Sequence, residues 1–376
     1  MHQNTSAKEM RLGRVIIYAG AVLAFLIGAA FATGQEVLMY YVAWGSELFA
    51  VIAVVLVILI WSTLSFAIAG SRQAFTKNEE IFTFFCGKYI GKFYDYFSAF
   101  FCYACYLFMI AGVGSTLQQQ FGIPSAVGAI GLSVVVILTV SLGLQKITDI
   151  LGRAGTIILA IIFFTSVWNL VANLDMVGPN LEAINTLGAE HFGMEKSIAS
   201  NALLNGLNYM GTVIIWFITF ITMMAVQSER KREVKVGAAV GAAAFMLSML
   251  IVALAMIAVI YQVGASDAPS IILAGNVWAP LASIFSVIVV AGSYTTAVPL
   301  LWTPVSRFAE DGSKQARLLA VVLGLVGVII ALIIPYKTLM NYVMNIGGML
   351  TYVLYGFIIW TDIKMFRQYI SKKSKA

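Results

Sequence analysis

The stretch "FLIGAAFATGQE", residues 25–36, lies inside an apolar run that is long enough to cross a membrane. Gly28 and Gly34 weaken a helix at this place, and the stretch ends in the acidic residue Glu36. A helix that only anchors the chain gains nothing from a carboxylate there, because ionisable groups inside a membrane are costly and are usually functional. The stretch therefore predicts a broken transmembrane helix that binds something.

Composition indicates the class of protein. Of 376 residues, 61% are hydrophobic and only 11% are charged, whereas soluble domains carry roughly 25% charged residues. Apolar runs of about 20 residues, the length that crosses the hydrocarbon core, recur along the whole chain. We expect an all-α integral membrane protein, because a lone span must satisfy its own backbone polar groups in lipid. The net charge of +6 then reports topology rather than nucleic-acid binding.

The apolar runs predict ten transmembrane helices. Their expected ranges are 14–43, 46–70, 93–118, 125–144, 152–174, 199–226, 234–262, 276–305, 316–334 and 337–362. With the N-terminus inside, every Lys and Arg except Lys196 and Lys337 falls on the inner side. The positive-inside rule then predicts a multi-pass protein of the cell membrane with both termini in the cytoplasm.

The spans divide into two halves of five. Residues 14–174 and 199–362 are predicted to form inverted-topology repeats, with an extracellular loop at 175–198. In such proteins an interrupted helix at the same place in each half marks the binding site. The first span is interrupted at "IGAAFATG" (27–34) and the sixth at "NALLNGLNYMGTV" (201–213). We interpret both as breaks, and the alternative is that their small residues simply allow tight helix packing.

Three stretches resemble known families. "GAAFATGQE" (28–36) and "MIAGVGSTLQQQFGIPSAVG" (109–128) resemble the first and third helices of YkvI-type membrane proteins. More remotely, "AGSYTTAVPLLWTPVSRFAED" (291–311) is similar to the eighth helix of neurotransmitter:sodium symporters, within the amino acid–polyamine–organocation superfamily. The resemblance implies a LeuT-type five-plus-five fold. The sequence departs from the pattern at Ala30, where the signature has glycine, and at Gly34, near the symporters' outer-gate arginine.

The resemblance also implies a sodium site between the first and eighth helices. Its implied ligands are the carbonyls of Ala24, Ile27 and Ala291 and the hydroxyl of Thr295. The position of a second hydroxyl aligns with Tyr294, so either Thr296 substitutes for it or the site is altered. The alternative is that both threonines hydrogen-bond to their own helix, as Ser and Thr often do in apolar spans. The fifth span has no Lys, Arg or His after Arg153 that could replace the ion.

The substrate is expected beside the two breaks. The candidate contacts are Gly28, Ala29, Ala30, Gly34 and Glu36 from the first helix, Asn205, Gly206, Asn208, Tyr209 and Gly211 from the sixth, and Tyr106 from the third. Tyr106 is either a wall of the site or part of the aromatic packing around it. Glu36 either stabilises the start of a half-helix through its dipole or faces the cavity and binds an amine or a proton.

These observations favour a secondary active transporter over other classes. We expect an ion-coupled symporter that moves a small organic solute, an amino acid or related amine, by alternating access. Proton coupling through Glu36 is the alternative. A channel or an enzyme fits less well, since neither a polar stripe nor convergent titratable groups are visible. Apart from Na⁺ or H⁺ as the coupling ion, no cofactor is expected, and the partners are the solute and the lipid bilayer, without nucleic acid or an obligate protein partner.

Overall fold

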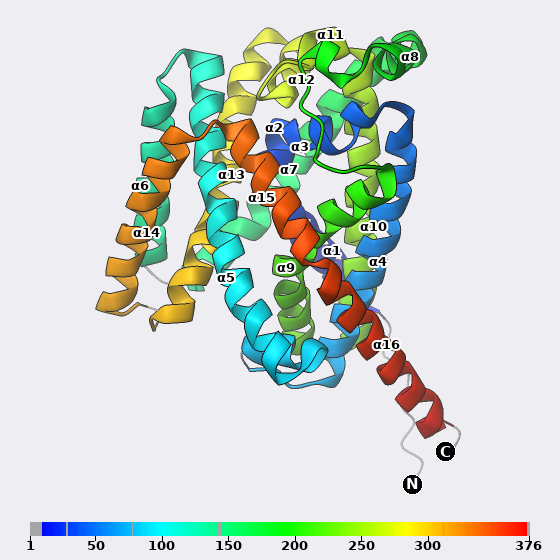
Figure 1. Cartoon of the computed structure of the whole chain (residues 1–376), viewed down its shortest axis with the longest axis vertical. Coiled ribbons are helices and arrows are strands. Elements are labelled where there is room, and N and C mark those ends of the chain that lie inside the picture. Colours follow the sequence, from blue (N-terminus) through cyan, green and yellow to red (C-terminus); the bar gives the residue numbers. More distant parts are fainter. Residues whose placement is uncertain (1–9, 28, 77, 142–144, 311, 374–376) are drawn as a thin grey trace.

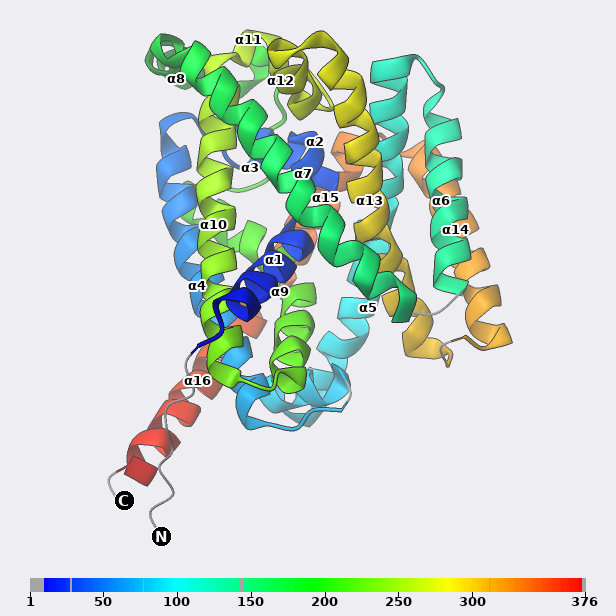
Figure 2. The same cartoon turned by 180° about the vertical axis from the view of Figure 1, so that it is seen from behind.

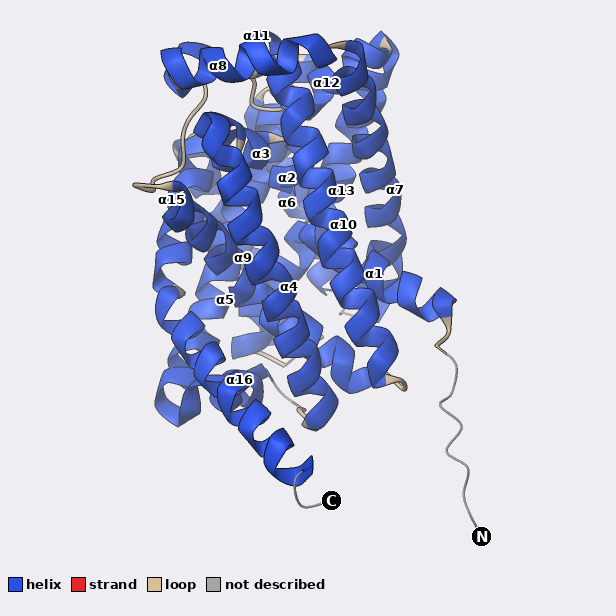
Figure 3. Ribbon diagram, turned by 90° about the vertical axis from the view of Figure 1, so that its right-hand side faces the viewer, coloured by secondary structure: helices blue, strands red, loops and turns tan. Residues whose placement is uncertain are grey.

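The computed structural model describes residues 10–27, 29–76, 78–141, 145–310 and 312–373; for residues 24, 29, 30, 78, 145–158, 369, 372 and 373 it describes the backbone alone. Within these ranges every regular element is a helix (Figure 3). This agrees with the expectation that a chain in lipid must close its backbone hydrogen bonds within each span.

The first half contains α1 (Leu12–Leu26), α2 (Ala29–Thr33), α3 (Gln35–Tyr40), η1 (Val42–Glu47), α4 (Leu48–Arg72), α5 (Asn78–Phe121), α6 (Ser125–Ser141) and α7 (Gln145–Ala172). A connecting region follows with η2 (Leu174–Met176), α8 (Val177–Leu187) and η3 (Ala189–Phe192). The second half contains α9 (Ala202–Gln227), α10 (Lys231–Ala258), α11 (Ile260–Val263), α12 (Pro269–Val277), α13 (Ala279–Phe308), α14 (Lys314–Ile333), α15 (Tyr336–Leu350) and α16 (Tyr352–Lys373). Figure 1 shows their arrangement.

The protein is a multi-span membrane protein. Among the described residues, six helices are long and apolar enough to cross a membrane, and up to eight if each of two bent pairs is one span. The bent pairs are 159–172 with 174–187, at 77°, and 336–350 with 352–368, at 41°. The shorter apolar helix α1 overlaps the first part of the first predicted span, and α6 covers most of the fourth. The total of ten crossings stays a prediction.

Helix contacts repeat when the two halves are exchanged. Counting the predicted spans in order, the first packs on the seventh (α1 on α10), and the second on the sixth (α4 on α9). Likewise the first packs on the fifth (α1 on α7), and the sixth on the tenth (α9 on α15). The third and eighth pack on each other (α5 on α13). These pairings are those of two similar repeats related by an approximate two-fold axis, as the inverted-repeat prediction requires.

Helix α8 of the connecting region and α11 of the second half lie across one end of the bundle. Figure 3 shows both at that end, roughly perpendicular to the long helices. The backbone turns by 77° between α7 and α8. The predicted loop at 175–198 is therefore largely helical, and it lies across an end of the molecule where the long helices stop.

The predicted break in the first span is confirmed. Helix α1 ends at Leu26, and Ile27 has the non-helical angles φ −83° and ψ 83°. A second interruption separates α2 from α3 at Gly34, whose φ of +86° is left-handed. A Cβ atom at Gly34 would lie 2.6 Å from the Oγ of Ser270, and it would also collide with Met256. Only glycine fits this position, for both conformational and steric reasons. Figure 2 shows α1 separated from α2 and α3.

The predicted break in the sixth span is wrong. Helix α9 runs from Ala202 to Gln227 without interruption. Its glycines instead allow close packing: a Cβ atom at Gly211 would lie 2.5 Å from the carbonyl oxygen of Gly348 on α15, and one at Gly206 would lie 2.7 Å from Val54 on α4. The small residues of this stretch thus serve helix contacts, which was the alternative interpretation.

Candidate functional site

Glu36 connects the broken first span to the sixth. It lies in the first turn of α3, directly after the left-handed Gly34, and its side chain is buried with an exposed fraction of 7%. Its Oε1 accepts a 2.5 Å hydrogen bond from the hydroxyl of Tyr209 on α9. The structure therefore brings together two predicted site residues that are far apart in the sequence and belong to different repeats.

Aromatic rings surround this carboxylate. The ring centroid of Tyr209 lies 5.3 Å from that of Tyr40 and 5.5 Å from that of Tyr41. All three rings are buried. Among the described side chains, no Lys, Arg or His nitrogen lies within 4 Å of the Glu36 carboxylate. Within the described residues, the hydrogen-bond partner of this buried carboxylate is a neutral tyrosine. The carboxylate can therefore take up a proton or bind an ammonium group.

Unpaired polar atoms lie on the same broken segment. The Oε1 of Gln35, beside Glu36, and the hydroxyl of Tyr40 are buried and have no hydrogen-bond partner among the described residues. Buried polar atoms are normally paired, so each such atom is a candidate contact for a ligand or a water molecule. The segment that follows Gly34 therefore carries both a charge and spare hydrogen-bonding groups.

A second link joins this segment to the tenth span. The Oγ1 of Thr33, the last residue of α2, lies 3.3 Å from the hydroxyl of Tyr336, the first residue of α15. Gly112 of α5 leaves room for the Tyr336 ring, since a Cβ atom at Gly112 would lie 2.9 Å from it. Sequence reasoning missed Tyr336. It also missed Tyr40, although its position four residues after Glu36 places both on one face of a helix.

The two asparagines of the sixth span hydrogen-bond to neighbouring segments of the same chain. The amide nitrogen of Asn205 donates to the carbonyl of Tyr40 at 2.7 Å, and its Oδ1 accepts from the hydroxyl of Ser197 at 2.6 Å. The Oδ1 of Asn208 accepts from the hydroxyl of Tyr352 at 2.5 Å. These side chains position the end of α3 and the start of α16 from an intact helix α9.

We expect Asn205→Ala to lower stability. The substitution removes two buried hydrogen bonds and leaves the Tyr40 carbonyl without this donor, at a cost of about 1–2 kcal/mol. Thermal unfolding of the purified protein in detergent measures the effect. Asn173→Ala is the matched control, because Asn173 is partly exposed and its side chain bonds only one turn back, to the Asn169 carbonyl. Equal unfolding temperatures for the two variants would contradict this role for Asn205.

The residues of the predicted sodium site lie on α1 and α13. Ala24 and Ile27 are at the end of α1, where the last carbonyls of a helix lack partners within it. The hydroxyls of Thr295 and Thr296 donate to the Gly292 carbonyl at 2.8 Å and 3.2 Å, which is the alternative arrangement for these residues. Ala291 is exposed. The carbonyls and hydroxyl oxygens suit a hard cation such as Na⁺, and the site stays a prediction.

The remaining candidates for substrate contacts lie on the first span and on α5. Gly28 lies outside the described residues, and Ala29 and Ala30 form the first turn of α2. The hydroxyl of Tyr106 lies 2.6 Å from the Oγ of Ser133 on α6, and a Cβ atom at Gly327 of α14 would lie 2.8 Å from the Tyr106 ring. Tyr106 therefore packs among α5, α6 and α14, as its structural alternative predicted.

The fold of this chain is shared by solved structures of membrane transporters. No protein-family model and no curated protein matches the sequence. The structure is similar to the inward-facing conformation of Mhp1, with 16% sequence identity over 92% of this chain and 75% of that chain and a TM-score of 0.57. The fold is LeuT-type. Two variants of the Eremococcus coleocola manganese transporter are also similar, with 12% identity over 96% of this chain and 79% of theirs and TM-scores of 0.57 and 0.55.

Proposed function

We propose that this LeuT-type chain is a secondary active transporter, an ion-coupled symporter of a small organic solute that is an amino acid or a related amine. The observation that carries the proposal is the broken first span, which places the buried carboxylate of Glu36 against Tyr209 of the other repeat. The solved structures with this fold, Mhp1 and a manganese transporter, support the class. Residues of the break contribute spare polar groups for the solute.

The Glu36–Tyr209 hydrogen bond suggests how binding is linked to movement. An ammonium group can pair with Glu36 while the Tyr209 hydroxyl still donates to it, because an ionised carboxylate has about four acceptor sites. A ligand changes the balance of two conformations only if it binds them with different affinity. An ammonium group that reaches Glu36 in one conformation and not in the other supplies that difference, at a contact between the two repeats. The solute thus favours a conformation in which α3 and α9 are differently placed.

Sodium coupling is proposed through the end of α1 and the Thr295 region. We expect Thr295→Ala to lower the apparent affinity for sodium in uptake about tenfold. The substitution removes one neutral oxygen ligand, which contributes about 1–2 kcal/mol of binding free energy. Uptake at graded sodium concentrations measures the change. Thr186→Ala is the control: the Thr186 hydroxyl also donates to a carbonyl of its own helix, that of Glu182 on α8, away from the predicted site. An unchanged sodium dependence in Thr295→Ala would remove this residue from the site.

Proton coupling through Glu36 is the second candidate. It is favoured by the neutral partner of this carboxylate, because a buried acid that lacks a cationic partner can take up a proton instead. In that case uptake follows an imposed pH gradient and is indifferent to sodium.

Both candidates are tested by one set of measurements. Purified protein is screened for thermal stabilisation by amino acids and amines, with and without sodium, and the stabilising compounds are then followed into proteoliposomes. Saturable uptake that depends on an ion gradient is expected. A protein that no amine or amino acid stabilises, and that moves none of them, would contradict the proposed solute class.

A further inference from the structure

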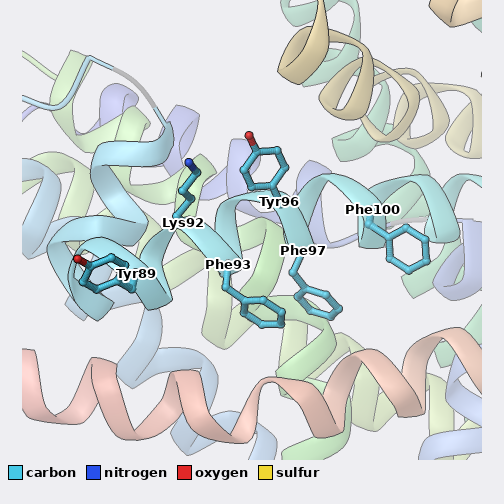
Figure 4. A pocket seen from close by; sticks show the side chains of 6 residues that line it. All are labelled: Tyr89, Lys92, Phe93, Tyr96, Phe97 and Phe100. Atoms are coloured by element: carbon cyan, nitrogen blue, oxygen red, sulfur yellow. The ribbon is translucent and has the colours of Figure 1, made fainter.

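A groove of about 420 Å³ lies on the outer surface of α5, near its bend at Gly87. It is lined by Tyr89, Lys92, Phe93, Tyr96, Phe97 and Phe100 (Figure 4). None of these residues belongs to the site around Glu36. The groove is therefore separate from that site.

Helical spacing explains the groove. Tyr89, Phe93 and Phe97 follow one another at intervals of four residues, and Lys92, Tyr96 and Phe100 form the next row on the same face. Figure 4 shows Lys92 and Tyr96 projecting to one side of α5 and Phe93 and Phe97 projecting to the other. The rings of Phe93 and Phe97 stack at 5.9 Å with an interplanar angle of 5°. Phe93 and Phe97 of the first row thus form a stacked aromatic pair.

The length of the groove matches one leaflet of a bilayer. From residue 89 to residue 100 the helix rises about 16 Å, while half of a hydrocarbon core of roughly 30 Å is about 15 Å. The exposed fractions are 85% for Tyr89 and 68% for Phe100, so the groove is open at both ends. At membrane depth, what contacts such a surface is the acyl chain of a lipid.

The two ends of the groove differ in chemistry. Phe100 closes the apolar end, whereas Lys92 and the Tyr89 phenol lie at the other end, beside the bend of α5. Lys92 is exposed, and among the described residues no carboxylate oxygen lies within 4 Å of its Nζ. Tyr and Lys at a span's end are typical of the headgroup region, where an ammonium attracts anionic lipid.

We propose that this groove binds an anionic phospholipid, with an acyl chain between the two aromatic rows and the phosphate at Lys92. Charge complementarity selects an anionic headgroup over a zwitterionic one. The apolar rows bind the chain of either lipid.

The test uses the full chain extracted from vesicles that hold equal amounts of phosphatidylglycerol and phosphatidylcholine. Native mass spectrometry counts the retained lipids. The wild-type protein is expected to retain phosphatidylglycerol preferentially, and Lys92→Gln to lower that retention about fivefold. Phe100→Ala is expected to lower retention of both lipids. Lys314→Gln, at an exposed lysine on α14, is the matched control and should retain lipid like the wild type.

Three results would overturn the proposal. In the first, Lys92→Gln retains phosphatidylglycerol as well as the wild type. In the second, Lys314→Gln loses as much lipid as Lys92→Gln, which indicates general surface charge rather than a site. In the third, the wild type retains no lipid and has the mass of two chains, which shows that a second copy covers the groove. Unfolding temperatures of the variants, all at exposed positions, confirm that each is folded.

Discussion

Replacing Glu36 by Gln is expected to reduce solute uptake to background. The amide keeps the shape of the side chain and can still accept the Tyr209 hydrogen bond, but it offers neither a charge to an amine nor a place for a proton. The free energy of unfolding should change by less than about 1 kcal/mol, because the weaker hydrogen bond is offset by the loss of a buried charge. Uptake into proteoliposomes at several pH values, together with thermal unfolding, measures both effects.

Tyr209→Phe separates the role of the Glu36 carboxylate from the role of its hydrogen bond to Tyr209. It removes the hydroxyl that donates to Glu36 and leaves the ring against Tyr40 and Tyr41. Uptake should persist at a reduced rate, because the carboxylate is still present. If Glu36→Gln transports normally at every pH, then Glu36 only stabilises the first turn of α3, and the proposed site is wrong.

Gly211→Leu is expected to destabilise the protein by roughly 3 kcal/mol or more. A Cβ atom at Gly211 would already lie 2.5 Å from the Gly348 carbonyl oxygen, and a Cβ at Gly348 would collide with the backbone of Asn208. Backbone cannot move aside as a flexible side chain can, so α9 and α15 must separate. Thermal unfolding and the yield of monodisperse protein in detergent measure the loss.

Gly356→Leu is the matched control for this substitution. Nothing lies within 4 Å of a Cβ atom at Gly356, which is on α16 of the same predicted span as Gly348. It should unfold at nearly the wild-type temperature. If Gly211→Leu is as stable as the control but fails to transport, then Gly211 is needed for backbone flexibility rather than for close packing. In that case the continuous α9 is not the functional conformation.

The fold could be predicted from the sequence because membrane helices are specified locally. Apolar runs predicted a chain of several membrane helices, and the broken first span followed from Gly34 and Glu36 within one stretch. Glycine at a left-handed position and a carboxylate in an apolar run are rare combinations with few physical explanations. The structure confirms that break and the all-helical, LeuT-type architecture.

The sixth span shows where such reasoning stops. Asn205, Asn208 and Gly211 have two physical explanations, an unwound segment or a polar and close-packed helix surface. The difference lies in their partners, Tyr40, Tyr352 and Gly348, which come from other parts of the chain. Tyr336 was missed for the same reason, since one tyrosine at the start of a span gives no sign of a hydrogen bond to Thr33. Tertiary partners decided these positions, and spacing within one helix could not.

The most direct test of the account is accumulation of solute against a gradient. Proteoliposomes with an imposed inward sodium or proton gradient are given an amine or amino acid that stabilises the purified protein. We expect the internal solute concentration to rise above the external one and to fall back when an ionophore collapses the gradient. With Glu36→Gln we expect no accumulation. Uptake that only equilibrates across the membrane, whatever the ion gradient, would contradict secondary active transport.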